Sequence, residues 1–275
     1  PGTGMIGLPV AAAVGITGGN PDAGLEVLKT LTPQQVDAAK ALLPIIKVDV
    51  KDVPDVLYAE VLAEADGHSA RVVICTDHTR IVLLEKDGEV LMEQDSAPGV
   101  QIQPAKSDKP AMTLREIVAF ALEVPLTEIA FIREAASMNQ ALADEGLQGY
   151  GLRIGKILTE QVERKLLSDD LMTLAMRLSS AASDARMDGA MLPAMSNSGS
   201  GNQGIAATMP VVAAARFLKA SDEQLTRALV MSHLVAIYIK AYQNKLSALC
   251  AASTAAMGSG AAITWLLGGQ FEQIS

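Results

Sequence analysis

The chain has 275 residues, of which 49% are hydrophobic and only 3% aromatic, and its formal net charge is −9. This length suffices for one large domain or two ordinary ones, with a core built from Ala, Val, Leu, Ile and Met. The acidic balance and the lack of a Lys/Arg cluster argue against nucleic acid as a partner. Two cysteines are too few for a disulfide scaffold and fit a reducing cytoplasm. No secretory leader is recognisable, and the start at Pro1 instead of Met leads us to expect an internal fragment.

The first 44 residues have the composition of helices. Thr32-Pro33-Gln34-Gln35 places an N-cap before a proline at the first helical position, and the apolar residues Val36, Ala39 and Leu43 follow. We expect residues 1–44 to form a helical segment that packs on a helical domain further along the chain.

Residues 45–95 alternate between apolar and polar side chains, with the period of β-strands. Asp66-Gly67 and Asp87-Gly88 each separate two such runs, and both dipeptides are typical of tight hairpin turns. The pattern predicts an antiparallel sheet of four or five strands, followed by a polar linker. The expected strands are 46–50, 56–65, 70–76, 80–85 and 89–94, and the expected linker is 96–110.

From Thr113 onward apolar residues recur at helical spacing. The expected fold class is therefore α+β, with a small antiparallel-sheet lobe, its flanking helices and a mainly α-helical domain. The run Leu246–Gly269 is uncharged over the length of a membrane span, but it is rich in Ala, Ser, Thr and Gly, so we expect buried helices there and no membrane contact. The expected helices begin near 113, 127, 154, 168, 205, 222 and 245, and the expected domains are 1–44, 45–148 and 149–275.

The most informative stretch is the glycine-rich run Ser196–Gly204, which precedes an apolar helical pattern. Its glycines allow a tight turn whose N–H groups point to one place, and a following helix would aim its positive end there too. The run also fits G-x-G-x-x-G, a dinucleotide-binding pattern that requires a preceding buried strand and a later acidic residue. Pro193 interrupts the segment before it, and Asp222 fits a helix-capping box better. The loop therefore predicts a cradle for an anionic group, with nucleotide binding as the weaker alternative.

Five side chains outside the loop could carry chemistry. Cys250 could be a small buried hydrophobe, a nucleophile or a metal ligand, whereas Cys75 in an apolar strand is expected to be core. His78 lies between two strands and could face a cleft, and His233 on an apolar helix could be a hydrogen-bonded core residue or a base. Arg186 ends a helix, where it could form a surface ion pair or bind a substrate carboxylate.

Taken together, these residues resemble the iron–sulfur L-serine dehydratase alpha-chain family, and most closely its cysteine-degrading branch, the L-cysteine desulfidases. The segment that ends at Asn202-Gln203-Gly204 is the most specific match, and the other segments support it. In family order, the matching segments are Pro1–Met5, His78-Thr79, Ser180–Met187, Leu192–Gly204, Ser232–Leu234 and Leu246–Cys250.

The resemblance implies a [4Fe–4S] cluster held by three cysteines, with one iron open to act as a Lewis acid on the substrate. Cys250 matches the middle ligand. The family's Cys-Thr-Glu-Pro and Cys-Asp-Gly segments, which carry the other two ligands, are not in this sequence. We therefore expect the cluster in the full-length parent but not in this fragment, which would be inactive alone.

The reaction implied by the resemblance is β-elimination of L-cysteine to pyruvate, ammonia and hydrogen sulfide, with L-serine dehydration as the nearest alternative. His78 or His233 would remove the α-proton. The glycine-rich loop would bind the substrate carboxylate, together with an arginine. The expected substrate-binding residues are Ser196, Asn197, Ser198, Gly199, Asn202, Gln203 and Arg186.

Two other classes of function stay open at this stage. One is a nucleotide-dependent enzyme that uses the glycine-rich loop, and the other is a non-catalytic subunit that binds small amino acids. For every class we expect a cytoplasmic protein, and the helices rich in Ala, Gly and Met suggest a homo-oligomer.

Overall fold

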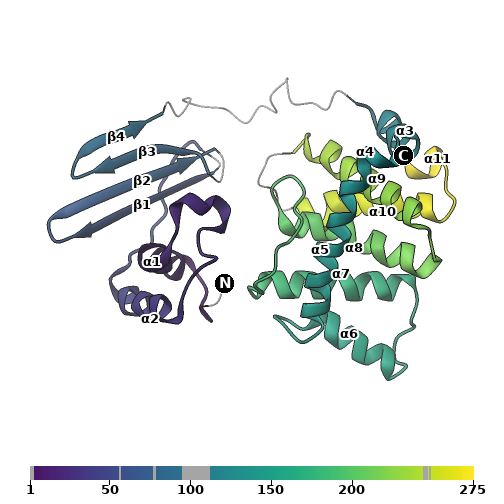
Figure 1. Cartoon of the computed structure of the whole chain (residues 1–275), viewed down its shortest axis with the longest axis horizontal. Coiled ribbons are helices and arrows are strands. Elements are labelled where there is room, and N and C mark those ends of the chain that lie inside the picture. Colours follow the sequence, from purple (N-terminus) through teal and green to yellow (C-terminus); the bar gives the residue numbers. More distant parts are fainter. Residues whose placement is uncertain (1–2, 56, 77–78, 95–111, 244–246, 248) are drawn as a thin grey trace. The chain divides into compact units, whose positions relative to one another are not determined.

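The computed structural model describes residues 3–55, 57–76, 79–94, 112–243, 247 and 249–275. The chain divides into two compact units, Pro1–Gln103 and Pro104–Ser275 (Figure 1). The expected linker over 96–110 lies outside the described residues.

The first unit begins with two helices, α1 (Leu8–Gly18) and α2 (Pro33–Leu42), each followed by a short 3-10 turn. Helix α2 begins where the sequence predicts, because the Thr32 hydroxyl accepts the Gln35 N–H while the Gln35 side chain accepts the Thr32 N–H. The two helices enclose a small apolar core, formed by Val10, Ala13, Val14 and Ala39.

A four-stranded antiparallel sheet completes the first unit, with strand order β1-β2-β3-β4. Asp66-Gly67 and Asp87-Gly88 both have positive φ at their two residues, as hairpin turns of type I′ require, so these two predictions are confirmed. The strand expected over 46–50 is absent, and Val50 is 94% exposed, because this alternating run pairs with no neighbouring strand. The strands are β1 (Tyr58–Ala65), β2 (His68–Cys75), β3 (Ile81–Lys86) and β4 (Glu89–Glu93).

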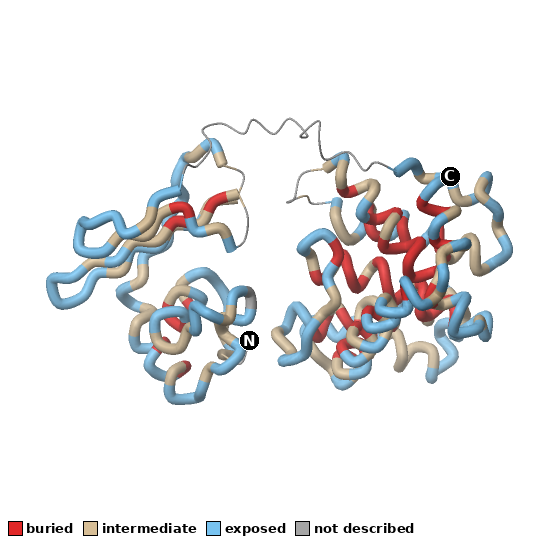
Figure 2. Tube along the Cα trace, turned by 45° about the horizontal axis from the view of Figure 1, so that its top comes forward, coloured by how far each residue is buried: buried red, intermediate tan, exposed pale blue. Residues whose placement is uncertain are grey.

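The second unit is helical, and most of the buried residues lie in it (Figure 2). Its core is made of aliphatic side chains, alanines and methionines. No helix in the described part of the chain is both long enough and apolar enough to cross a membrane. The α-helices are α3 (Leu114–Glu123), α4 (Leu126–Ile129), α5 (Arg133–Gly146), α6 (Ile154–Glu163), α7 (Leu171–Met187), α8 (Gly201–Leu218), α9 (Asp222–Lys240), α10 (Ala256–Leu266) and α11 (Phe271–Ile274), with a π-helical segment, η4 (Cys250–Ala255), before α10.

The division into units differs from the three segments expected from the sequence. Helices α3 and α5 group with the helical unit and not with the sheet, because α3 packs on α9 and α5 packs on α7. Ile117, Val118 and Leu142 of these helices are part of the same apolar core. The packing of residues 1–44 on the helical domain stays a prediction.

Several helices begin at other residues than predicted, for local reasons. The helix expected from Thr127 is interrupted by a 3-10 turn, Ala130–Ile132, so that α5 starts only at Arg133. Helix α7 starts at Leu171 and not near 168, because the Asp170 carboxylate accepts the Thr173 N–H at 2.9 Å and caps the helix there.

Helix α8 begins inside the glycine-rich run, at Gly201 and not at residue 205. The Ser200 hydroxyl accepts the Gln203 N–H at 3.3 Å and acts as the N-cap. Asn202, Gln203 and Gly204 therefore form the first turn of an 18-residue helix. The loop proper is shorter than the sequence suggests, and it leads directly into the positive end of this helix.

Candidate functional site

The tip of the glycine-rich loop is a tight turn. Asn197 and Ser200 exchange two backbone hydrogen bonds, of 3.1 and 3.0 Å between nitrogen and oxygen. The two residues between them, Ser198 and Gly199, have φ values of 49° and 79°, the signature of a type I′ turn. Both are exposed, so the turn presents its backbone and the Ser198 hydroxyl to solvent.

The Asn197 side chain points away from this surface and into the protein, where it is 3% exposed. Its amide nitrogen lies 3.1 Å from Nδ1 of His233 and donates to the His233 carbonyl oxygen at 3.1 Å. Its amide oxygen accepts from the Gln203 side chain at 2.8 Å and from the Ser198 hydroxyl at 3.0 Å. The hydrogen bonds between Asn197 and His233 therefore attach the loop to helix α9.

The other ring nitrogen of His233 contacts Thr208 on α8, with 3.0 Å between Nε2 and the hydroxyl oxygen. The Thr208 hydroxyl donates to the Gly204 carbonyl at 2.7 Å, so towards His233 and Asn139 it acts as an acceptor. This network assigns the proton of His233 to Nε2 and leaves Nδ1 to accept from Asn197. Burial lowers the pKa of His233 to about 4, so the imidazole is neutral at physiological pH.

Another residue, distant in the sequence, completes this scaffold. Asn139 of α5 donates to Thr208 at 3.2 Å and accepts the Met195 N–H at 3.0 Å. The side chain is completely buried. No motif in the sequence marks Asn139. The only signal is that this polar residue occupies a position that the spacing of the apolar residues in α5 assigns to the buried face.

The seven residues predicted to bind substrate thus divide into two groups. Asn197 and Gln203 are buried and hold the loop in shape. Ser196, Ser198, Gly199 and Arg186 are exposed and Asn202 is partly so, which leaves these five accessible to a small molecule.

Arg186, one residue before the end of α7, lies against the start of α8. Its Nη1 donates to Asn202 Oδ1 at 3.2 Å. A Cβ atom at Gly201 would collide with the Arg186 side chain in its present position, so glycine allows this close approach. Among the described residues Arg186 forms no ion pair. An unpaired guanidinium and the positive end of an 18-residue helix therefore meet at one place, which favours an anion.

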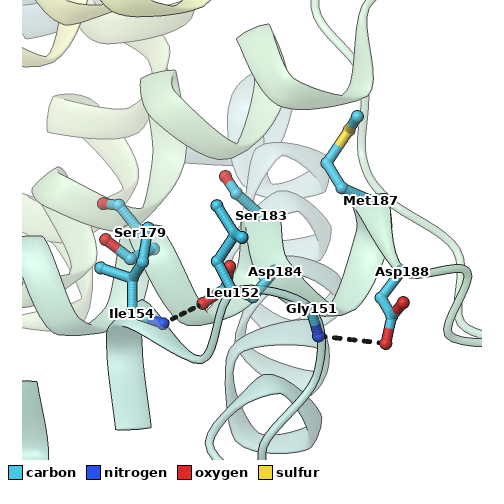
Figure 3. A pocket seen from close by; sticks show the side chains of 9 residues that line it. Gly151, Leu152, Ile154, Ser179, Ser183, Asp184, Met187 and Asp188 are labelled. Atoms are coloured by element: carbon cyan, nitrogen blue, oxygen red, sulfur yellow. Dashed lines mark hydrogen bonds between the residues drawn. The ribbon is translucent and has the colours of Figure 1, made fainter. Parts of the chain in front are cut away.

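A pocket of about 590 Å³ lies on the same helix, next to this place (Figure 3). Ser179, Ser183 and Met187 line it from successive turns of α7. Met187 connects the pocket to the loop, because its sulfur accepts from the Asn202 amide at 3.2 Å. No motif in the sequence marks the pocket, although these residues recur every four positions on one face of a helix.

Two aspartates hold the opposite wall of the pocket in place (Figure 3). Asp184 accepts the backbone N–H groups of Ile154 at 2.7 Å and Gly155 at 3.4 Å. Asp188 accepts the Gly151 N–H at 3.0 Å. These two carboxylates attach the turn that precedes α6 to helix α7. They do so by accepting hydrogen bonds from backbone N–H groups.

The predicted metal ligand Cys250 is the first residue of η4 and is partly buried. No three His, Cys, Asp or Glu side chains come together among the described residues, so Cys250 is there a single candidate ligand. Cys75 belongs to the sheet core, as expected, and burial raises the pKa of its thiol. His78 lies outside the described residues.

The dinucleotide-binding reading of the loop is wrong. It requires a buried strand before Ser196, but residues 189–195 form no strand, and the four described strands belong to an antiparallel sheet in the other unit. Asp222 begins α9 behind a capping box formed by Ser221 and Gln224, as its sequence context indicates.

Comparisons with known proteins agree on one family. The family model described as serine dehydratase alpha chain matches residues 22–275. UPF0597 proteins of Aeromonas salmonicida and Aeromonas hydrophila are 94% and 91% identical over the whole chain, which corresponds to 63% of each relative. A UPF0597 protein of Shewanella pealeana is 54% identical over the whole chain and 64% of its own length. The chain thus spans slightly less than two thirds of these relatives, and no solved structure matches it.

Proposed function

Because the chain belongs to the serine dehydratase alpha-chain family, we propose that the whole protein is a lyase that eliminates the β-substituent of a small L-amino acid. L-cysteine is the first candidate substrate and L-serine the second. Removal of the α-proton and cleavage of the Cβ–S bond release hydrogen sulfide and leave aminoacrylate. Water then hydrolyses its imine tautomer to pyruvate and ammonia. With L-serine the leaving group is water.

The observation that carries this proposal is the position of Arg186 at the start of α8. A substrate carboxylate there would meet a guanidinium with two parallel donors and the unpaired N–H groups of a helix N-terminus. Asn202 holds the guanidinium from one side, at 3.2 Å. The exposed turn at Ser198 and Gly199 adds further polar groups at the same entrance.

The adjoining pocket supports a small polar substrate. The Ser179 hydroxyl lines it and is buried, and it has no hydrogen-bond partner among the described residues. An unpaired buried hydroxyl is costly unless a ligand completes its hydrogen bonding. We propose that the amino acid enters between Met187 and the loop, and that its polar groups extend toward this pocket.

For the proton transfer, the contacts of His233 favour a positioning role. Both of its ring nitrogens are engaged, and its low pKa opposes the gain of a proton. We therefore propose that His233 holds the loop and does not act as the base.

The resemblance also implies a [4Fe–4S] cluster, with Cys250 as one ligand. The described residues do not bring together a set of ligands for such a cluster. Cluster ligation by Cys250, a homo-oligomeric assembly and a cytoplasmic location all stay predictions.

The test is an assay of the full-length protein, with sulfide and pyruvate measured from L-cysteine and pyruvate from L-serine. Arg186→Ala removes a charge-assisted contact, typically about 1.5–3 kcal/mol, and is expected to lower kcat/KM about 10- to 100-fold through KM. Arg186→Lys should restore only part of this, because lysine lacks the forked donor pair. Arg164→Ala, at the exposed end of α6, is the matched control.

An unchanged KM in the Arg186→Ala variant would refute the carboxylate site. Product from neither amino acid would refute the lyase proposal. Binding of either amino acid without turnover would instead favour a non-catalytic amino-acid-binding subunit.

A further inference from the structure

Lys240, the last residue of α9, carries a buried charge. The residue is only 6% exposed, and its ammonium nitrogen has no hydrogen-bond partner in the described part of the chain. It also forms no ion pair with any described carboxylate. Taking an ammonium out of water without a counter-charge costs several kcal/mol. A buried ammonium without a counter-charge indicates that an anion which is not one of the described residues binds beside it.

The register between α8 and α9 places Lys240 at the substrate end of the unit. The Ser232 hydroxyl donates to the Ala207 carbonyl at 2.6 Å, and Thr208 lies 3.0 Å from His233. Helices α8 and α9 are consecutive and joined by a short turn, so they run in opposite directions. Gly201 precedes Thr208 by seven residues, and Lys240 follows His233 by seven residues. Both distances are about 10 Å, so Lys240 lies at the end where α8 begins.

Lys240 also lies on the face of α9 that carries His233. Seven residues are close to two helical turns, so residues 233 and 240 share one face. His233 contacts α8 and the loop from this face. The segment η4 packs on both α8 and α9, and Thr254 in it donates to Gln243, just after α9, at 3.0 Å. Helix α8 and η4 are therefore neighbours of α9 near the end of the helix that Lys240 occupies.

Two cations without a carboxylate partner among the described residues thus lie at the same end of the α8–α9 pair. Arg186 is exposed at the loop and Lys240 is buried. The first turn of α8 adds its own positive field at this end.

We propose that Lys240 binds the α-carboxylate of the small amino acid as its inner counter-charge, opposite Arg186, at the first turn of α8. This inference rests on the proposed function for the identity of the ligand. Arg186 attracts the carboxylate at the entrance, and Lys240 fixes it where water is excluded. A buried charge pair of this kind also selects for carboxylate over uncharged analogues, because an uncharged group would leave the ammonium unpaired.

The test measures binding without turnover, on the full-length protein. L-alanine has the carboxylate and ammonium of the substrate but no leaving group, and L-alaninamide lacks the negative charge. We expect L-alanine to raise the Tm of the wild-type protein and L-alaninamide to leave it unchanged. Lys240→Met should weaken L-alanine binding at least about tenfold in calorimetry, and Lys240→Arg should retain most of it.

Lys219→Met is the matched control, because Lys219 is exposed at the opposite end of α8. It should bind L-alanine like the wild type. Without ligand, Lys240→Met should have a Tm equal to or above that of the wild type, because an unpaired buried charge is removed. Lys240→Gln provides a second neutral variant if the methionine variant does not fold.

Unchanged L-alanine binding in the neutral variants would overturn the inference. So would equal stabilisation of the wild type by L-alaninamide, or no binding of L-alanine at all. If L-alanine binding depends on Lys240 but neither L-cysteine nor L-serine is converted, the proposed reaction fails while the carboxylate site stands.

Discussion

The Thr208 hydroxyl oxygen accepts a hydrogen bond from Nε2–H of His233, with 3.0 Å between oxygen and nitrogen, because its own proton is donated to the Gly204 carbonyl oxygen. The direction of this hydrogen bond places a proton on Nε2 and so decides the tautomer of the neutral imidazole. It leaves Nδ1 as the acceptor for Asn197, which holds the loop. The shape of the loop therefore depends on a histidine that stays neutral.

The stability of the protein should accordingly fall when His233 is forced to gain a proton. Its pKa is about 4 in the folded state and about 6.5 when unfolded, so the unfolded state binds the extra proton between these values. The stabilisation is complete above pH 6.5 and is lost as the pH falls toward 4, by about 3 kcal/mol in all. The measurement is the free energy of unfolding from pH 7.5 to 4.5.

His233→Gln provides the comparison, because glutamine does not titrate. The part of the pH dependence between 6.5 and 4.5 that belongs to His233 should disappear in this variant. An identical slope in the variant and the wild type would contradict the assignment of a neutral, buried imidazole.

Gly204 should not tolerate a side chain. A Cβ atom there would collide with the Met195 carbonyl oxygen, so the backbone that leads into the loop would have to move. We expect Gly204→Ala to lower the free energy of unfolding by about 1–3 kcal/mol and to weaken L-alanine binding. Gly260→Ala in α10 is the control, since a Cβ there meets no atom within 4 Å and alanine is the better helix former. Equal effects of the two substitutions would contradict the close approach at Gly204.

Asp184 should support the pocket through the backbone that it holds. Asp184→Ala removes the acceptor of the Ile154 and Gly155 N–H groups and is expected to destabilise the protein by about 1–3 kcal/mol. Hydrogen exchange should become faster at residues 151–157 and stay unchanged in α10. Protection of the first turn of α6 that is identical to the wild type would contradict this role.

Cys250 is predicted to ligate iron in the full-length protein. After anaerobic reconstitution with iron and sulfide, the wild type and Cys75→Ala should show the visible absorption of an iron–sulfur cluster, and Cys250→Ser should lose most of it. Chelation of iron should remove the absorption and the elimination activity together. A full cluster signal in Cys250→Ser would refute this ligand assignment.

Features with a local signal could be predicted from the sequence. The N-cap at Thr32, the capping box at Ser221 and the two Asp-Gly turns depend on residues within three or four positions of one another, and all four form as predicted. The strand predicted over 46–50 does not form, because an alternating pattern produces a strand only where a neighbouring strand is available for pairing.

The interior of the site could not be predicted in this way. Asn197 reads as a loop side chain that is available to a ligand, yet it points inward to a partner 36 residues away. Asn139 lies 69 residues from Thr208, and their contact exists only after helices α5 and α8 have docked. Lys240 has an ordinary sequence context, and only its burial distinguishes it. Burial and long-range partners depend on tertiary packing, which the sequence pattern of one segment does not contain.

The inward anchoring of Asn197 has a thermodynamic consequence for ligand capture. A loop with an exposed Ser-Gly tip would normally lose much conformational entropy when it closes on a small molecule, and this cost would be subtracted from the affinity. Here folding itself has already restricted the backbone, through bonds to α9 that exist before any ligand arrives. Association should therefore proceed as rigid docking, with a modest entropic cost and little change in the loop between the free and bound states.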